Sequence, residues 1–433
     1  MRISLETVRA RWSFVFVLVF ISAGFCFLVG KVWLAQHWSA SPNPQLWLRA
    51  AKLEPGNAEY WQRLGLYAES DIQHLDVSQA IAYLKRAAKV NPRSDEIWVD
   101  LASAYEELGR AAEAREAYQN AQADYPISGE IAWRYGSFLL RQGDLTGGFG
   151  QIRRALAVEP SLTTSAVEES WEASGDAASI TDEALPATSS YYLAALGYFV
   201  SQKQHDPALV VWKRLLKLGQ PIEMNQTIPL VNQLISENHI SDAETTWREA
   251  LQATRWPHQE VDDNSVVFNG GFEYEVANGG FDWREESVSG VTHALDYLVT
   301  HSGKQSMSIT FDGSTNLDFV DLAQFVPVKS KEQYRFKAYL RTQDITTDSG
   351  MRFLIYDPNH PSDAQILTPN FMGTNPWTPV ESDVSTGPDT DLLVIALRRI
   401  PSRKFDNKLA GTVWIDDVSL VPSETLALTG KSK

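Results

Sequence analysis

The sequence predicts three consecutive parts of different fold class: a membrane-spanning helix, an all-α array of helical repeats and an all-β sandwich. The residues from Ser13 to Gly30 carry no charge, and this length is just sufficient to cross the hydrocarbon layer of a bilayer. Prolines then recur every 34 to 37 residues as far as Pro160, which is a period typical of helical repeats. After Val266 the apolar residues alternate with polar ones, as they do in half-buried strands.

The composition excludes several classes of protein. A chain of 433 residues is long enough for two or three packed domains. Its formal net charge of −16 argues against sequence-independent binding of nucleic acid, because that binding needs a basic surface. Its single cysteine, Cys26, excludes an intrachain disulfide and a cysteine-based metal site. We therefore expect several domains and no nucleic-acid partner.

The apolar segment is expected to be a transmembrane anchor over residues 12–35, after a cytoplasmic tail of residues 1–11. Three arginines and one acid precede the apolar run, and an excess of positive charge marks the cytoplasmic side of a membrane. The protein would then be a single-pass membrane protein whose soluble domains lie outside the cytoplasm, in the bacterial periplasm. A cleaved signal peptide is the alternative, although the run is longer than usual and no small-x-small site follows it directly.

Residues 40–255 are expected to form helical hairpins that stack into a solenoid. Four prolines mark the ends of successive units: Pro55, Pro92, Pro126 and Pro160. Three tryptophans open the units between them: Trp61, Trp98 and Trp133. Each unit therefore consists of a helix, a turn and a second helix that ends before proline. Beyond residue 160 the period weakens, but the apolar spacing still predicts helical hairpins.

These units resemble tetratricopeptide repeats. The middle unit carries most of the family pattern: Trp98, Leu101, Ala102, Tyr105, Ala114, Tyr118, Ala121 and Pro126. The first unit departs from it by the insertion "SDIQHLD", and the third has Gly147 and Gly148 near a usual alanine. The resemblance implies a concave surface that binds a peptide or helix of a protein partner. We assign the shared aromatic positions to packing between helices and select no ligand-binding residue among them.

Residues 265–422 are expected to form an all-β sandwich. Five alternating segments are separated by clusters of Gly, Pro, Asn and Asp, at 306–312, 333–342, 351–357, 392–400 and 412–421. A junction with few contacts across it is placed at residues 253–264, "ATRWPHQEVDDN", because this stretch contains proline and acidic residues and has few helix formers. The repeats and the sandwich are therefore expected to be separable domains.

The opening stretch "NGGFE" and "GGFDW", together with the terminal "VWIDDVSLV", resembles carbohydrate-binding modules of the galactose-binding-like jelly-roll class. The resemblance implies that Phe272, Phe281 and Trp283 fill the core of a jelly roll. Glycines beside these aromatic residues permit the sharp turns that return the first strand to the sandwich. A role for Trp283 in stacking on sugar is accordingly not expected.

The same resemblance implies a structural calcium ion near the joined ends of the domain. Its side-chain ligands would be Glu273 and either Asp416 or Asp417, with backbone oxygens completing the hard ligand set. The alternative is that both aspartates lie at a strand edge and face water. No other cofactor is expected.

Alternation in the segment 333–342 divides its side chains between two faces. The predicted core face holds Tyr334, Phe336, Ala338 and Leu340, and the predicted outer face holds Arg335, Lys337, Tyr339 and Arg341. We expect the outer face to continue through Arg352 and Tyr356 on a second strand and Arg398 on a third. Such a surface could stack a sugar ring on tyrosine and pair a uronate or sulfate with guanidinium groups. An ordinary solvated sheet face is the alternative.

The sequence contains no catalytic motif. Its eight histidines show no H-E-x-x-H and no paired metal spacing, and no G-x-S-x-G is present. We therefore expect a non-catalytic, membrane-anchored envelope adaptor that binds a protein partner through its repeats and a glycan or polysaccharide through its sandwich. A purely structural assembly factor is the first alternative. A glycoside hydrolase is a more distant one, because two catalytic carboxylates need no local motif.

Overall fold

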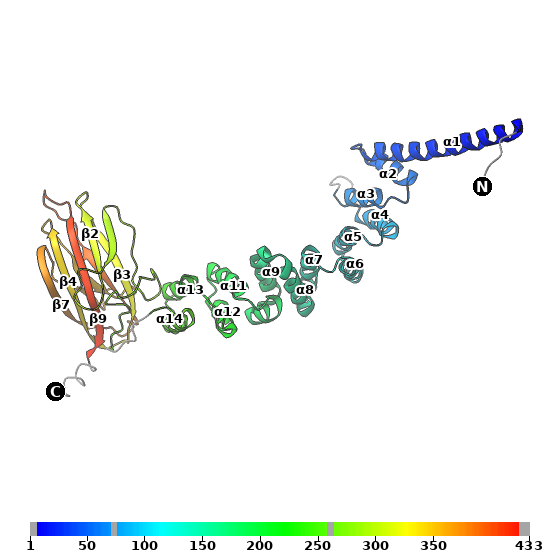
Figure 1. The fold of residues 1–433 in the computed structure, drawn as a ribbon. Helices are drawn as coiled ribbons and strands as arrows, with labels where there is room; N and C mark the ends of the chain where they lie inside the picture. Colours follow the sequence, from blue (N-terminus) through cyan, green and yellow to red (C-terminus); the bar gives the residue numbers. More distant parts are fainter. Residues whose placement is uncertain (1–6, 71–75, 258–263, 424–433) are drawn as a thin grey trace. The chain divides into compact units, whose positions relative to one another are not determined.

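The computed structural model describes residues 7–70, 76–257 and 264–423 (Figure 1). The chain divides into two compact units, Met1–Pro186 and Ala187–Lys433. The first unit holds an apolar helix and several helical hairpins, and the second holds two further hairpins and two β-sheets. The predicted order of an all-α region followed by a β-sheet region is confirmed.

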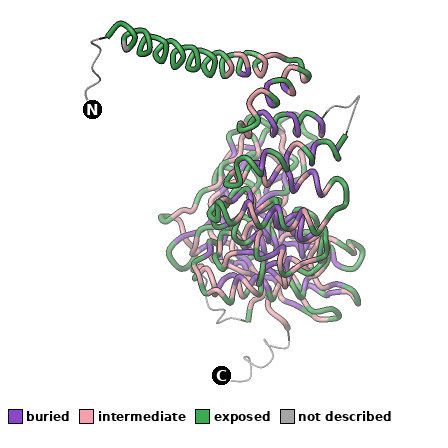
Figure 2. The backbone as a smooth tube through the Cα atoms, turned by 90° about the vertical axis from the view of Figure 1, so that its right-hand side faces the viewer, coloured by how far each residue is buried: buried purple, intermediate pink, exposed green. Residues whose placement is uncertain are grey.

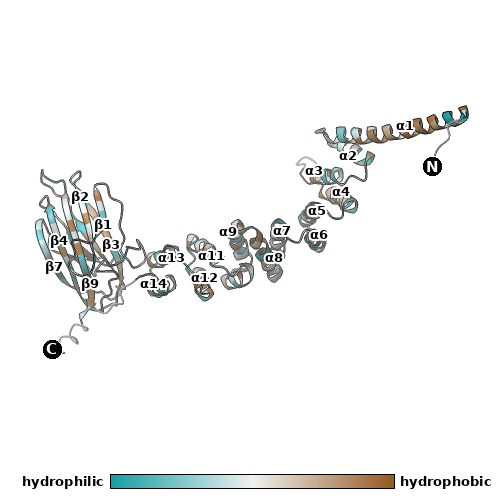
Figure 3. Cartoon of the chain, in the orientation of Figure 1, coloured by the Kyte–Doolittle hydropathy of each residue, from teal (hydrophilic) through white to brown (hydrophobic). Residues whose placement is uncertain are grey.

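Helix α1 (Val8–Ser39) is apolar and exposed over most of its length (Figure 2, Figure 3). Within the described residues it is the one helix long and apolar enough to cross a membrane, although a signal sequence has the same properties. Its last turns differ from the rest, because Ala35 is fully buried in a cluster with residues of α2 (Pro44–Leu53) and α3 (Ala58–Ser70). The end of α1 therefore belongs to the core of the first repeat.

The remaining helices of the first unit pair into hairpins in chain order. They are α3 with α4 (Val77–Val90), α5 (Asp95–Glu107) with α6 (Ala111–Asp124), and α7 (Gly129–Arg141) with α8 (Leu145–Val158). A 3-10 turn (Pro160–Leu162), α9 (Thr163–Ser174), α10 (Ala177–Ser179) and a π-helical turn (Ile180–Ala184) follow. The predicted helical solenoid is confirmed, with buried residues along the inner faces of its helices.

In two units, the tryptophan that opens the unit is tied to the proline that closes the unit before it. The indole nitrogen of Trp61 donates a hydrogen bond of 3.1 Å to the carbonyl of Pro55, and that of Trp98 donates one of 2.8 Å to Pro92. These bonds fix the start of α3 and α5 against the preceding turn. The spacing of six residues between tryptophan and proline thus has a structural cause.

Two glycines allow the helices of a hairpin to approach closely. A Cβ atom on Gly65 would lie 2.6 Å from Cγ of Leu84, and one on Gly148 would lie 2.6 Å from Cδ2 of Leu140. Neither site has room for a larger residue unless the leucine moves. The glycine that departs from the repeat pattern in the third unit is therefore explained by the close packing of α7 on α8.

The second unit begins with two more hairpins. They are α11 (Ser189–Ser201) with α12 (His205–Leu218) and α13 (Met224–Ser236) with α14 (Ile240–Thr254). Their buried faces include Trp212, which is fully buried, and Trp247, which is 4% exposed. The helical pattern therefore continues almost to the predicted end of the repeats.

Two antiparallel sheets form the β region of the second unit. The five-stranded sheet has the order β1-β2-β9-β4-β7, and the four-stranded sheet has the order β3-β8-β5-β6. The strands are β1 (Val291–Asp296), β2 (Ser306–Asp312), β3 (Phe319–Pro327), β4 (Gln333–Ile345), β5 (Arg352–Tyr356), β6 (Gln365–Leu367), β7 (Gly373–Ser385), β8 (Leu392–Arg399) and β9 (Ala410–Pro422). One hydrophobic cluster with residues from both sheets forms the core.

The predicted alternation on β4 is confirmed. Its core face, which includes Tyr334 and Phe336, is at most 2% exposed, whereas its outer face is partly accessible. Phe272 and Trp283 are also fully buried in the core of the sandwich, as predicted. Strands β1, β3, β6 and β7 were not among the five predicted; prolines interrupt the pattern of β7, which lies at the edge of its sheet, where proline is tolerated.

The opening stretch of the β region packs against α13 and α14. The ring of Trp247 lies edge-on to those of Phe268 and Phe281, at centroid distances of 5.4 and 6.4 Å. On α13, Asn232 Oδ1 accepts hydrogen bonds from the backbone of Gly280 and from Arg284. The expectation of few contacts across residues 253–264 is therefore wrong, because the opening aromatic residues also pack on the helices. Residues 258–263 of this junction lie outside the described part of the chain.

Candidate functional site

A groove of 660 Å³ crosses the helices α5, α7 and α9. It is lined by Ser103, Glu106, Tyr118, Glu130, Trp133, Arg134, Ser137, Arg141 and Glu169. All of them except Tyr118 lie on the first helix of a unit or on α9, where polar residues recur at spacings of three and four. Since residues at this spacing share one face of a helix, stacking the units joins their polar faces into one surface.

Charged side chains of this groove bridge successive repeats. Arg141 Nη2 lies 2.7 Å from Glu106 Oε2, and its Nη1 lies 3.5 Å from Glu169 Oε1. The hydroxyl of Ser137 donates a 2.7 Å hydrogen bond to the second oxygen of Glu169. The groove thus has both charge signs within reach of one another, which suits a peptide with mixed charges.

Beneath these charges lies an aromatic floor. The rings of Tyr118 and Tyr135 stack at 5.4 Å, and the Tyr118 hydroxyl donates a 2.7 Å hydrogen bond to Glu106. Burial, and then the bond to Glu106, raises the pKa of Tyr118 well above its usual range, so the phenol stays a donor. Packing is confirmed for Tyr118 and Trp61, which are buried, while Trp133 is half-buried and lines the groove.

The predicted glycan-binding residues lie on two different sheets. Arg335, Tyr339 and Arg341 are on β4 in the five-stranded sheet, whereas Arg352, Tyr356 and Arg398 are on β5 and β8 in the four-stranded sheet. The single continuous face that we expected is therefore wrong. Alternation assigns a side chain to the outside of its own sheet, but it does not reveal which strands are neighbours.

On β4 the outer side chains already have partners. Arg335 forms ion pairs with Glu381 and Asp383 on β7, at 2.6 and 2.7 Å. The ring of Tyr339 stacks on that of His301 at 3.5 Å, and the guanidinium of Arg341 lies 5.4 Å from the ring centroid of Trp414. The positive charge of Arg335 is thereby balanced within the sheet.

On the four-stranded sheet the arginines are more crowded. Arg352 on β5 is opposite Arg398 on β8 in the strand register, and burial, with the charge of Arg398, lowers the pKa of Arg352. Arg398 forms an ion pair with Asp318 and donates a 2.9 Å hydrogen bond to the carbonyl of Phe319. Tyr356 is half-buried on the same strand as Arg352.

The predicted calcium ligands converge on the loop formed by residues 301–304. Asp416 Oδ2 accepts hydrogen bonds from the backbone nitrogens of His301 and Ser302, at 2.8 and 3.2 Å. Asp417 binds the side chains of the same two residues, and Glu273 Oε1 accepts a 2.8 Å bond from the backbone of Lys304. Burial raises the pKa of Asp416 to about 6. The sequence pattern therefore led to three carboxylates that do gather around one loop.

A cavity of 420 Å³ opens beside this loop. Its lining includes Glu273, His301, Lys337, Tyr339 and Asp417. Lys337 and Tyr339 from the outer face of β4 thus line the same cavity as Glu273 and Asp417, a connection that no local sequence pattern predicts. His301 lies in no metal-binding motif of the sequence, so its pairing with Asp417 was not predicted.

Comparison with known proteins identifies the repeats. The family model described as "Tetratricopeptide repeat" matches residues 68–126 and 99–161. No curated protein matches the chain. Tetratricopeptide repeat proteins generally serve as non-catalytic protein-interaction or assembly adaptors.

Solved structures of similar proteins show low identity. A crystal structure of MamA is 16% identical, covering 40% of this chain and 85% of that one with a TM-score of 0.27. YrrB, described as "a TPR protein with an unusual peptide-binding site", is 10% identical over 49% of this chain and 95% of that one, with a TM-score of 0.27. A tetratricopeptide repeat protein from Parabacteroides merdae is 14% identical over 48% and 85%, with a TM-score of 0.29. On the strength of the family match, residues 68–161 of this chain carry tetratricopeptide repeats.

Proposed function

We propose that this protein is a non-catalytic, membrane-anchored adaptor of the bacterial cell envelope, which holds a protein partner in the groove over α5, α7 and α9. The groove is the observation that carries the proposal. It combines an aromatic floor with exposed Arg134 and the ion pairs of Arg141, in a region that matches an interaction repeat. An extended or helical segment with side chains of both charge signs would exchange ion pairs with the arginines and glutamates of the groove.

The anchor is supported by how α1 ends. Ala35 and Trp38 pack with Trp47 and Trp61 in the first helical cluster. Cleavage beyond Trp38 would remove both from that cluster, and cleavage nearer Gly30 would leave them on a short chain end cut off from the rest of α1. We therefore propose that α1 is retained, with its arginine-rich end in the cytoplasm. A C-terminal reporter that is active only in the cytoplasm would contradict this topology.

Site-specific photo-crosslinking in cells tests the groove. A photoreactive phenylalanine at position 133 should give a discrete adduct with a partner protein, and Arg134→Glu with Arg141→Glu should abolish it. The control is Lys89→Glu, a charge reversal at an exposed position of α4 outside the groove. Equal adduct yields from the groove variant and the control would remove the groove from the proposal.

A second proposed function is glycan or polysaccharide binding by the β region, which we take to be a jelly roll. The cavity beside Tyr339, His301 and Lys337 supports it, because aromatic and cationic side chains meet there on a partly accessible surface. On a glycan array, acidic glycans should bind, and added salt should weaken that binding by screening the charges. Tyr339→Ala with Arg341→Ala should reduce the affinity.

The control for the glycan experiment lies on the opposite face of β4. Phe336→Ala should cost about 3 to 5 kcal/mol of folding free energy, because this ring is fully buried, whereas Tyr339→Ala should leave the fold intact. If no glycan binds to the folded protein, the purely structural assembly factor becomes the better description. Turnover of a mixture of glycosides would instead support a hydrolase.

We also propose that Glu273, Asp416 and Asp417 hold a structural calcium ion. Three carboxylates around one loop are the oxygen ligands that calcium prefers, and Asp416 is fully buried. Calcium should raise the melting temperature of the wild-type protein but not of Asp416→Asn. An unchanged melting temperature of the wild type in saturating calcium would contradict the site.

A further inference from the structure

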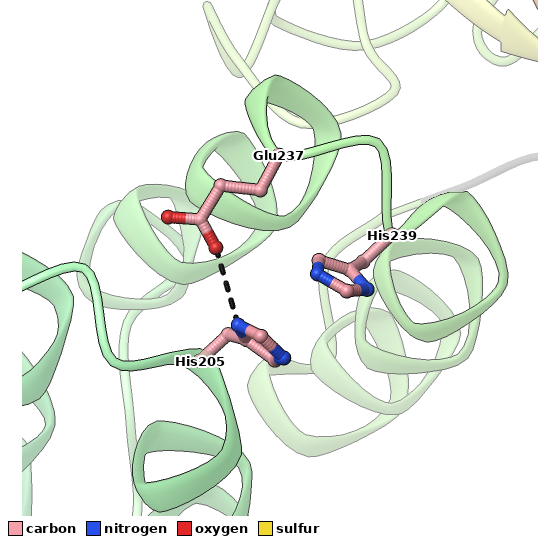
Figure 4. Close-up of side chains that lie close together, drawn as sticks. All are labelled: His205, Glu237 and His239. Carbon is pink, nitrogen blue, oxygen red and sulfur yellow. Dashed lines mark ion pairs between the residues drawn. The ribbon is translucent and has the colours of Figure 1, made fainter.

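Two histidines and a glutamate from successive helical hairpins meet in the second unit. His205 is the first residue of α12, Glu237 follows the last residue of α13, and His239 precedes α14. One ligand atom from each of these residues lies within 4.8 Å of the other two (Figure 4). The three side chains are all partly exposed, so an ion from solvent can reach them.

Stacking of equivalent turns brings these residues together. Lys203 and Asn238 occupy the left-handed region in the two turns, with φ of 55° and 62°, and they are 35 residues apart. Gly109 and Gly143 hold the same conformation in earlier turns, 34 residues apart. Because the solenoid places the same turn of neighbouring hairpins side by side, a histidine on one turn faces a histidine and a glutamate on the next. Local sequence spacing cannot reveal such a set.

The spacing of His205 and Glu237 suits zinc. His205 Nδ1 lies 3.3 Å from Glu237 Oε2, and two ligands bound about 2.0–2.1 Å from a tetrahedral zinc ion are about 3.3 Å apart. The rings of His205 and His239 have centroids 4.0 Å apart. Two imidazoles and one carboxylate form a known zinc ligand set, which leaves a fourth position for water.

Neighbouring side chains orient the ligands. Asp206 Oδ1 lies 3.3 Å from His205 Nε2, so it can hold the proton there and leave Nδ1 free to bind a metal. Gln233, which is 7% exposed, donates a 3.1 Å hydrogen bond to Glu237 Oε1 and leaves Oε2 facing His205. These contacts give each of the two ligands a second, outer partner, as is usual in zinc sites.

We propose that His205, Glu237 and His239 bind one zinc ion, which cross-links the hairpin α11–α12 to the hairpin α13–α14. A simple ion pair between His205 and Glu237 would account for two of the residues, but it gives no role to the imidazole of His239 beside them. A metal ion uses all three and fixes the angle between two repeats. The inference is independent of the proposed partner and glycan.

Metal binding by the full chain in detergent tests the proposal. After treatment with a chelator, the protein should take up one zinc ion in competition with a chromophoric chelator. Cobalt in place of zinc should give the visible absorption of a four-coordinate ion. When the free zinc concentration is a hundred times the dissociation constant, the unfolding transition of residues 187–433 within the full chain should shift upward by roughly 5 to 10 °C.

Variants decide where the ion binds. His205→Gln, Glu237→Gln and His239→Gln should each weaken zinc binding by more than about a hundredfold, and Asp206→Asn should weaken it by about tenfold. The control is His301→Gln, since His301 pairs with Asp417 in the sandwich; it should leave zinc affinity unchanged. Failure of the wild-type protein to bind zinc or cobalt overturns the proposal, and so does undiminished binding by the variant lacking all three ligands.

Discussion

The repeats α5–α8 and the hairpins α11–α14 are built from the same helical unit but differ in what covers them. In α5–α8, the polar side chains of the first helices line an accessible groove. In α13 and α14, Trp247 and Asn232 contact the opening stretch of the β region. One repeat geometry therefore serves two purposes, because its exposed face is either accessible or already covered by the same chain.

The turns of the two regions differ as well. Gly109 and Gly143 occupy the left-handed position in the first region, whereas Lys203 and Asn238 occupy it in the second. A residue with a side chain is strained there, and glycine is not. The second region therefore tolerates local strain at the turns where its two histidines and glutamate meet.

Removing the side chain of Trp247 should have the largest effect. Trp247→Ala should lower the free energy of unfolding by about 3 to 5 kcal/mol, because the ring is 4% exposed and contacts Phe268 and Phe281. Trp133→Ala, in the open groove, should cost no more than about 1 kcal/mol. Urea unfolding followed by circular dichroism measures both, and equal losses would show that the two regions do not differ in this way.

Asp282 should make the stability of the covered region depend on pH. Its carboxylate is fully buried and accepts hydrogen bonds from the backbone of Ala277 and Trp283. Burial raises its pKa from the ordinary 3.8 to about 7. Between these two pH values Asp282 keeps its proton in the folded state and loses it in the unfolded state. The contribution of Asp282 to the free energy of unfolding is therefore fully present below pH 3.8 and is lost as the pH rises towards 7.

Between pH 3.8 and 7, Asp282 should lower the free energy of unfolding by at most about 1.4 kcal/mol for each pH unit. It is measured as the difference in slope between the wild type and Asp282→Asn, because Asp416, with a pKa raised to about 6, adds a slope of the same sign in both. Asp282→Asn should be less stable at low pH, since its amide nitrogen cannot accept the second hydrogen bond. Parallel pH profiles for the two proteins would refute the role of Asp282.

The helical hairpins and five of the nine described strands were predictable from the sequence, but which elements pack or pair with one another was not. Alternation identified the buried face of β4 because the pattern is local to one strand. It could not show that β5 and β8 belong to the other sheet, because pairing joins strands far apart in the chain. Phe281 was expected in the sandwich core but faces Trp247, and His205 meets His239 only because hairpins stack.

The smallest effects should come from exchanging the residues at the left-handed turns. A Cβ atom on Gly143 would meet nothing within 4 Å, so Gly143→Ala changes only the backbone energy. The left-handed strain of about 1–2 kcal/mol is partly offset by the lower entropy of the unfolded chain, worth about 0.5–1 kcal/mol. The net loss of stability should therefore be about 0.5–1 kcal/mol.

Lys203→Gly is the reverse exchange in the other region. Lys203 has a φ of 55° and is exposed. Glycine at this position removes the backbone strain of the left-handed conformation, but it raises the conformational entropy that the chain loses on folding. Stability should rise by up to about 0.5–1 kcal/mol, because the same two quantities now act with opposite signs. Thermal unfolding of both variants, compared with the wild type without added metal, measures the pair. If both substitutions lower the melting temperature, side-chain contacts of Lys203 outweigh its backbone strain, and the turns of the two regions are not distinguished by strain.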